Sequence, residues 1–160
     1  MVGDPDWRRE WACVVDDPEC GPDAWCPCRQ IAGEGIRVCE VETRLRGWYD
    51  ATLDVINVRQ GLDHARHRST LAHELVHADL REARPPRLWE EMQQERRARI
   101  LAARDLIRLR DLAVALAESV TEREAARRLD VDVATLRRRV GTLTDEERQY
   151  VELAIDRYAA

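Results

Sequence analysis

The hydrophobic pattern is clearest in the middle of the chain, in the segment Ser69–Leu80. The apolar residues of this segment are spaced so that they line one face of an α-helix. The segment is therefore predicted to be a half-buried helix. Asp63 suits the N-cap of this helix, because its side chain can accept a hydrogen bond from a free backbone N–H group. Four residues form the apolar stripe: Leu71, Ala72, Leu75 and Val76.

Two segments before this helix have the composition of β-strands. Arg37–Leu45 and Ala51–Val58 are rich in Val and Thr, and the turn-like sequence Gly47–Asp50 lies between them. We expect two antiparallel strands. The second is predicted to be an edge strand that binds an extended peptide through Val55, Ile56, Asn57 and Val58. The alternative is that both strands only cover the helix.

The segment Leu88–Leu116 contains no Gly or Pro and is predicted to be helical, in one or two pieces. Its buried stripe is expected to include one carboxylate, Glu95, and a buried carboxylate needs a partner such as a metal ion. Two alternatives remain open: Glu95 pairs with Arg99 one turn on, or Glu91 is the ligand. The other stripe positions are Leu88, Met92, Ala98, Ala102, Leu106 and Leu109.

The C-terminal segment Thr121–Val140 resembles a helix-turn-helix, with Asp130 in the turn where Gly is usual. If it binds DNA, Arg137, Arg138 and Arg139 are expected on the recognition helix. The basic surplus of this segment is small, so the favoured interpretation is that it packs against the rest of the protein or docks its substrate.

The predicted central helix carries the pentad His73-Glu74-Leu75-Val76-His77, an HExxH motif. Residues four apart lie on the same helical face, so both imidazoles can face one cation. Neutral imidazoles suit Zn²⁺, and the adjacent Glu74 can act as a general base toward a water molecule at that metal. A catalytic zinc usually takes three protein ligands, so a third ligand is required.

Arg68–His77, followed by Glu95–Ala98 and then Ala102-Ala103, resembles the ImmA/IrrE-type metallo-endopeptidases of bacteria, prophages and mobile elements. In that family a Glu-x-x-Ala motif on the next helix completes the zinc site. The resemblance implies that His73, His77 and Glu95 bind zinc and that Glu74 is the catalytic base. Leu101-Ala102 replaces the usual Phe-Ala, and Arg99 stands where Asn or Asp is common.

The resemblance implies an α+β fold: a small zincin-like domain, with a short antiparallel sheet, an HExxH helix and a third-ligand helix, and a helical C-terminal extension. The expected divisions are a cysteine-containing lobe at residues 1–46, the metallopeptidase core at 47–116 and the extension at 117–160. The resemblance also implies cleavage of a specific partner, such as the transcriptional repressor of a phage or mobile element. The alternative is a DNA-binding or repressor-binding regulator with a non-catalytic metal site.

The composition fits a small cytoplasmic protein of 160 residues with no secretion signal and no membrane-spanning segment. Its net charge of −5 gives no overall attraction to nucleic acid or to anionic membranes. The five cysteines lack a familiar zinc-binding spacing, so reduced thiols are favoured over a second, structural zinc. These are Cys13, Cys20, Cys26, Cys28 and Cys39.

Overall fold

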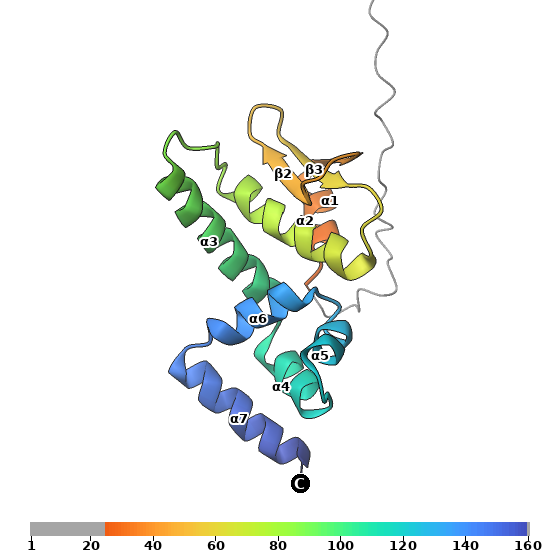
Figure 1. Ribbon diagram of the computed structural model, residues 1–160, viewed down its shortest axis with the longest axis vertical. Helices are drawn as coiled ribbons and strands as arrows, with labels where there is room; N and C mark the ends of the chain where they lie inside the picture. The colour runs from red at the N-terminus through yellow and green to blue at the C-terminus, as the bar shows by residue number, and fades with distance from the viewer. Residues whose placement is uncertain (1–24, 160) are drawn as a thin grey trace, which may run out of the picture.

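Seven helices and a three-stranded sheet form the part of the chain that the structure, a computed structural model, describes, residues 25–159 (Figure 1). The fold is therefore α+β, as predicted. The elements in chain order are α1 (Pro27–Glu34), β1 (Arg37–Val41), β2 (Gly47–Asp50), β3 (Val55–Arg59), α2 (His64–Asp79), α3 (Leu88–Leu106), α4 (Leu109–Ala117), α5 (Glu122–Arg128), α6 (Val133–Gly141) and α7 (Asp145–Ala159).

Helix α2 is the central element, because it contributes to two hydrophobic cores. Leu71 and Leu75 pack against the sheet and α1, while Ala72 and Val76 pack among residues of the C-terminal helices. All four are at most 6% exposed, which confirms the predicted apolar stripe. The N-cap is also confirmed, since the Asp63 side chain accepts a hydrogen bond from the backbone N–H of Arg66 at 2.9 Å.

The sheet differs from the prediction in its pairing. The strand order is β1-β3-β2, with β1 parallel and β2 antiparallel to β3. The predicted turn Gly47–Asp50 is itself strand β2, and the chain reverses after it, where the Asp50 side chain accepts hydrogen bonds from the backbone N–H groups of Thr52 and Leu53. The antiparallel pairing of Arg37–Leu45 with Ala51–Val58 was therefore wrong.

The prediction that Val55–Val58 forms an edge strand was also wrong. Strand β3 lies between β1 and β2, so neighbouring strands occupy both of its hydrogen-bonding edges. Three of the four predicted substrate-binding residues are buried: Val55, Ile56 and Val58. A nearly continuous apolar sequence is typical of a strand covered on both faces, and this pattern should have indicated a central position. The edge strands are β1 and β2.

The predicted helical segment Leu88–Leu116 is present as α3 and α4, separated by Ile107 and Arg108. The second half of the predicted stripe, Ala98, Ala102 and Leu106, is buried. The first half was wrong, because Leu88 and Met92 are 72% and 63% exposed. None of the helices within residues 25–159 combines the length and apolar composition needed to span a bilayer.

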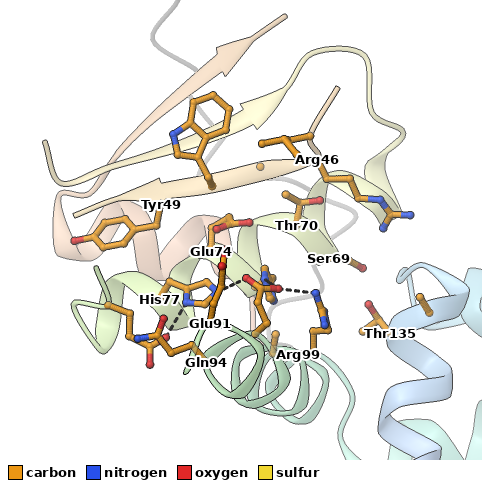
Figure 2. Close-up of a pocket in the computed structure, with 18 of the residues that line it drawn as sticks. Arg46, Tyr49, Ser69, Thr70, Glu74, His77, Glu91, Gln94, Arg99 and Thr135 are labelled. Atoms are coloured by element: carbon orange, nitrogen blue, oxygen red, sulfur yellow. Dashed lines mark hydrogen bonds and ion pairs between the residues drawn. The ribbon is translucent and has the colours of Figure 1, made fainter. Parts of the chain in front are cut away.

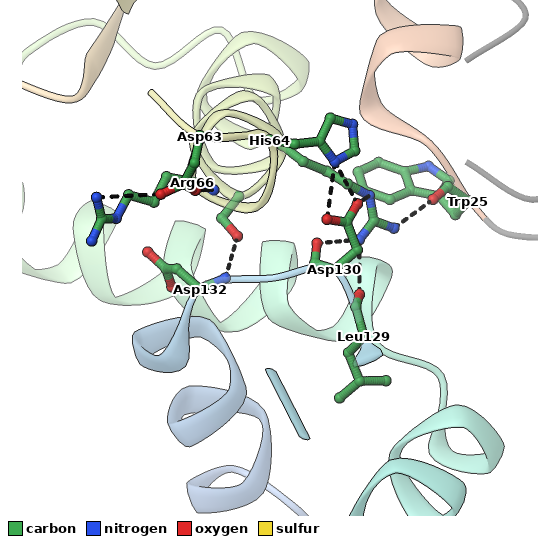
Figure 3. A network of polar contacts seen from close by, with 9 residues as sticks. Trp25, Asp63, His64, Arg66, Leu129, Asp130 and Asp132 are labelled. Atoms are coloured by element: carbon green, nitrogen blue, oxygen red, sulfur yellow. Dashed lines mark hydrogen bonds and ion pairs between the residues drawn. The ribbon is translucent and has the colours of Figure 1, made fainter. Parts of the chain in front are cut away.

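Helices α5 and α6 dock on α2 through the turn that joins them (Figure 3). Asp130 in this turn has a left-handed backbone, with φ of 50°. The buried Arg68 of α2 donates hydrogen bonds to the backbone carbonyls of Leu129 and Asp130, at 3.2 and 2.9 Å. The N–H group of Asp132 donates to Ser69 Oγ at 3.1 Å. The C-terminal helices are thus held against the HExxH helix, which agrees with the packing interpretation.

Arg139 cannot contact DNA as the alternative interpretation required, because it is only 3% exposed. Its Nε donates to the carbonyl of Ile107 at 3.1 Å, and its two terminal nitrogens lie 3.1 and 3.0 Å from the carboxylate of Glu147. Arg137 pairs with Glu122 on the surface, and the exposed Arg138 lines a cleft.

We expect Arg139→Ala to lower the free energy of unfolding by about 2–4 kcal/mol, because a buried carbonyl and a carboxylate lose a charged donor. Denaturant unfolding measures this. Arg123→Ala, an exposed arginine of α5, is the matched control and is expected to change stability by less than about 0.5 kcal/mol. Equal stability of the two variants would contradict a structural role for Arg139.

Candidate metal centre

The structure brings together the three side chains predicted to bind the metal. His73 and His77 lie one turn apart on α2, and Glu95 lies on the adjacent α3. His73 Nε2 is 3.5 Å from one Glu95 oxygen, and His77 Nε2 is 3.4 Å from the other. The adjacent imidazoles of His73 and His77 hold the pKa of Glu95 well below its usual range, so Glu95 is a carboxylate. Its oxygens are therefore suited to a cation.

Each imidazole lies at a distance from a Glu95 oxygen that two ligands of one zinc ion would have. Ligand atoms about 2.0–2.1 Å from a zinc ion at tetrahedral angles are separated by about 3.3–3.4 Å. The two Nε2–oxygen distances are close to this value. Among the described residues, buried His77 Nε2 has no hydrogen-bond partner, and a metal ion would satisfy it.

Glu74 borders the same position. Ligand atoms of His73, Glu74 and His77 all lie within 4.8 Å of one another. Glu74 is 5% exposed, and this burial raises its pKa, while the two histidines and a hydrogen bond from the backbone of Tyr49 act in the opposite direction. A buried carboxylate with a raised pKa is a stronger proton acceptor than a solvated one.

Glu95 lies against Arg99 as well as the two histidines. Arg99 Nη2 lies 2.6 Å from Glu95, so the expected helical ion pair is present in addition to the histidine contacts. Glu91, the other candidate ligand, instead pairs with Arg84 at 3.3 Å. The geometry favours Glu95 as the third ligand.

A second carboxylate, Glu82, contacts the Nδ1 atom of His77, the ring nitrogen that does not face Glu95. Glu82 Oε2 lies 2.8 Å from His77 Nδ1, and its side chain is only 6% exposed and forms an ion pair with Arg97. An ionised carboxylate can only accept a hydrogen bond, so the neutral imidazole carries its proton on Nδ1. The Nε2 lone pair then faces Glu95 and the candidate metal position, which is the tautomer a metal ligand needs.

The contact of Glu82 with His77 could not be predicted from the sequence, because Glu82 lies beyond the end of α2. The helix ends at Asp79, and Arg81 then takes a left-handed conformation with φ of 48°. The chain turns back, and the Glu82 N–H donates to the carbonyl of His77 at 2.9 Å. A glycine would have indicated this turn, but none is present.

The metal position lies in a cleft of about 1070 Å³ (Figure 2). Its floor is α2, and its walls are β2 on one side and α3 on the other. The N-terminal part of α6 closes one end, and the α2–α3 loop lies at the other. Five residues of α3 line the cleft from one face of that helix: Glu91, Gln94, Glu95, Arg99 and Ala102.

Gly47 allows β2 to lie directly on the HExxH helix. A Cβ atom at this position would come within 2.7 Å of Thr70 Cγ2 and 2.8 Å of the carbonyl oxygen of Asn57. It would also lie 3.3 Å from Cγ of Glu74. A larger residue would therefore displace the strand from the metal position.

The cysteines do not form a second metal-binding group within residues 25–159, where the candidate group is His73, Glu74 and His77. Cys26 and Cys28 are buried beside the sheet, and Cys39 lies on β1. Cys13 and Cys20 lie outside the described residues, so the expectation of reduced thiols, with a cysteine-bound zinc as its alternative, stays a prediction.

An HExxH helix, a carboxylate on the next helix and a small overlying sheet define a zincin-like fold. Residues 34–141 match the IrrE N-terminal-like domain of the peptidase M78 family. The chain belongs to this family, which confirms the resemblance found in the sequence. No curated protein and no solved structure matches the chain. Its family and its possible metal site are those of a metallopeptidase.

Proposed function

We propose that the protein is a zinc-dependent endopeptidase. The observation that carries this proposal is the position of Glu74 beside the convergent ligand atoms of His73, His77 and Glu95 in a cleft. Three ligands of this kind leave a fourth position for water or substrate. A structural site would have no need of a buried carboxylate at that position.

In this proposal bound zinc supplies Lewis acidity for water and for the peptide carbonyl. His73, His77 and Glu95 hold the metal. The Glu74 carboxylate accepts the proton of the attacking water and donates it to the leaving nitrogen. The backbone of Tyr49 orients Glu74 for this transfer through its hydrogen bond.

We expect the peptide substrate to bind along the free edge of strand β2. The Arg59 N–H donates to the carbonyl of Arg46 at 2.8 Å. Backbone groups of alternate residues point to opposite sides of a strand, so those of Gly47 and Tyr49 point away from β3. The Tyr49 N–H is hydrogen-bonded to Glu74, so the N–H and carbonyl of Gly47 and the carbonyl of Tyr49 are the groups along the cleft that an added extended strand could pair with. Peptide binding at a sheet edge, predicted for Val55–Val58, is therefore proposed for β2 instead.

The proposed substrate is a specific partner protein, such as the transcriptional repressor of a phage or mobile element. The support is membership of this peptidase family together with the resemblance in the sequence. The test is incubation of the zinc-loaded protein with the repressor encoded nearest to its own gene, followed by intact-mass analysis. Discrete fragments formed by the wild type but not by Glu74→Gln would support cleavage, and an intact repressor would exclude that substrate.

We expect Glu82→Ala to weaken zinc binding about 10- to 100-fold, because His77 loses the carboxylate that fixes its tautomer. Glu82→Gln retains a hydrogen-bond acceptor for Nδ1 and is expected to recover part of the affinity. Competition with a chromophoric chelator measures this. Glu118→Gln, a surface glutamate paired with Arg128, is the control. Unchanged affinity in Glu82→Ala would contradict the positioning role.

A further inference from the structure

The cleft has two chemically different ends. Tyr49, Gln94 and Glu91 lie toward one end, and Arg46, Arg99 and Thr135 lie toward the other (Figure 2). Three arginines line the second end: Arg46 in the loop before β2, Arg99 on α3 and Arg138 on α6. We call this group the arginine end.

The arginine end carries more positive charge than its own acids neutralise. Arg46 forms an ion pair with Asp132, and Arg99 pairs with Glu95. Arg138 is exposed, and among the residues that the structure describes its guanidinium has no carboxylate partner. Once Glu95 binds a metal, Arg99 also shares its carboxylate with that cation.

The dimensions of the cleft place this charge close to the scissile bond. From Glu91 to Ala102, α3 rises about 16–17 Å, at about 1.5 Å per residue. An extended peptide of about five residues covers that length. Arg99 lies one turn, about 6 Å, from Glu95 along the helix axis. A side chain at the arginine end therefore belongs to a residue within about three positions of the bond at the metal.

We propose that the arginine end is a subsite for an Asp or Glu side chain of the peptide substrate, with Arg138 as its principal contact. This inference rests on the proposed function, since it concerns the selectivity of the same cleft. A guanidinium binds a carboxylate through two parallel hydrogen bonds, and the walls of a cleft strengthen that attraction relative to open solvent. The Ser69 hydroxyl group lies at the same end of the cleft (Figure 2).

Under this proposal, helix α6 takes part in selecting the peptide substrate. Ala134, Thr135 and Arg138 face the cleft, while Leu136 and Arg139 on the same helix are buried against the protein. The resemblance of this segment to a DNA-binding unit thus reflects its helical hairpin. Its cleft-facing arginine contributes to peptide selection instead.

The test uses a synthetic peptide library with randomised positions and amidated C-termini, so that only side chains supply carboxylates. Zinc-loaded wild type, Arg138→Glu and the control Arg123→Glu are incubated with it, and the cleaved bonds are identified by mass spectrometry. We expect wild type to favour Asp or Glu over Asn or Gln about tenfold at one position within three residues of the bond, equivalent to about 1.4 kcal/mol. Arg138→Glu should remove this preference, and Arg123→Glu should retain it.

A binding measurement separates this inference from the proposed function. The same library is passed over immobilised, zinc-loaded Glu74→Gln, with and without Arg138→Glu, and the retained peptides are sequenced. Enrichment of acidic peptides that depends on Arg138 supports the subsite, even if no Glu74-dependent cleavage occurs and the peptidase proposal fails. Cleavage or retention without an acidic preference overturns the subsite and leaves the peptidase proposal intact. A preference seen only with free C-termini would assign the arginine end to a terminal carboxylate and overturn the side-chain proposal.

Discussion

Glu74→Gln is expected to lower the rate of peptide-bond hydrolysis about 10²- to 10⁴-fold, the range typical of general acid–base catalysis. The amide cannot accept the proton of the attacking water, whereas the buried carboxylate, with its raised pKa, can. The substitution nearly conserves volume, and Gln can still accept the hydrogen bond from the backbone of Tyr49. The measurement is the cleavage rate at saturating zinc, on a peptide selected from the library.

The zinc content of Glu74→Gln decides how this loss is interpreted. Because His73, His77 and Glu95 remain, we expect the variant to bind as much zinc as wild type. The surface variant Glu118→Gln controls for the change in charge and is expected to retain full activity. Hydrolysis at the wild-type rate in Glu74→Gln would exclude Glu74 as the base, and a parallel loss of zinc would make it a ligand.

Glu95→Ala is expected to weaken zinc binding at least about 100-fold, more than the loss of a residue that only orients a ligand. The two imidazoles would remain, but the oxygens that lie 3.5 and 3.4 Å from their Nε2 atoms would be lost. Chelator competition measures the affinity. The variant is expected to fold, since Glu95 is only partly buried and alanine favours helix.

Glu91→Ala provides the matched comparison for this prediction. Glu91 is also a carboxylate of α3 in the cleft, but its partner is Arg84. It is expected to bind zinc with an affinity within about threefold of wild type, the effect of a small surface change. If Glu91→Ala loses zinc and Glu95→Ala retains it, the ligand assignment is wrong and Glu91 takes its place.

The helices and the chemistry of the motif could be predicted from the sequence because both depend on local spacing. The HExxH pentad fixes its two histidines on one face of α2 whatever surrounds the helix. Glu95 stood out because a charge interrupted an apolar row. That row was only half right, since Leu88 and Met92 are exposed. Their exposure depends on which part of α3 contacts α2, and no local pattern contains this information.

The sheet and the outer contacts of the metal position depend on long-range pairing. Strand β1 pairs with β3, and β2 forms the edge at the cleft, although β2 has only four residues and a turn-like sequence. Glu82 reaches His77 through a left-handed residue that is not glycine. Arg138 is 43 residues from Glu95 along the chain and reaches the cleft because Arg68 and Ser69 dock the α5–α6 turn on α2.

The measurement that tests the central claim most directly is the zinc content of the purified, reduced wild-type protein after zinc loading and removal of free metal. His73→Ala/His77→Ala, purified in parallel, corrects for zinc bound elsewhere on the chain, including at the cysteines. A difference of about one zinc per chain between the two proteins is the predicted result. Equal zinc content in the two proteins would contradict a metal site at His73 and His77, and with it the peptidase proposal.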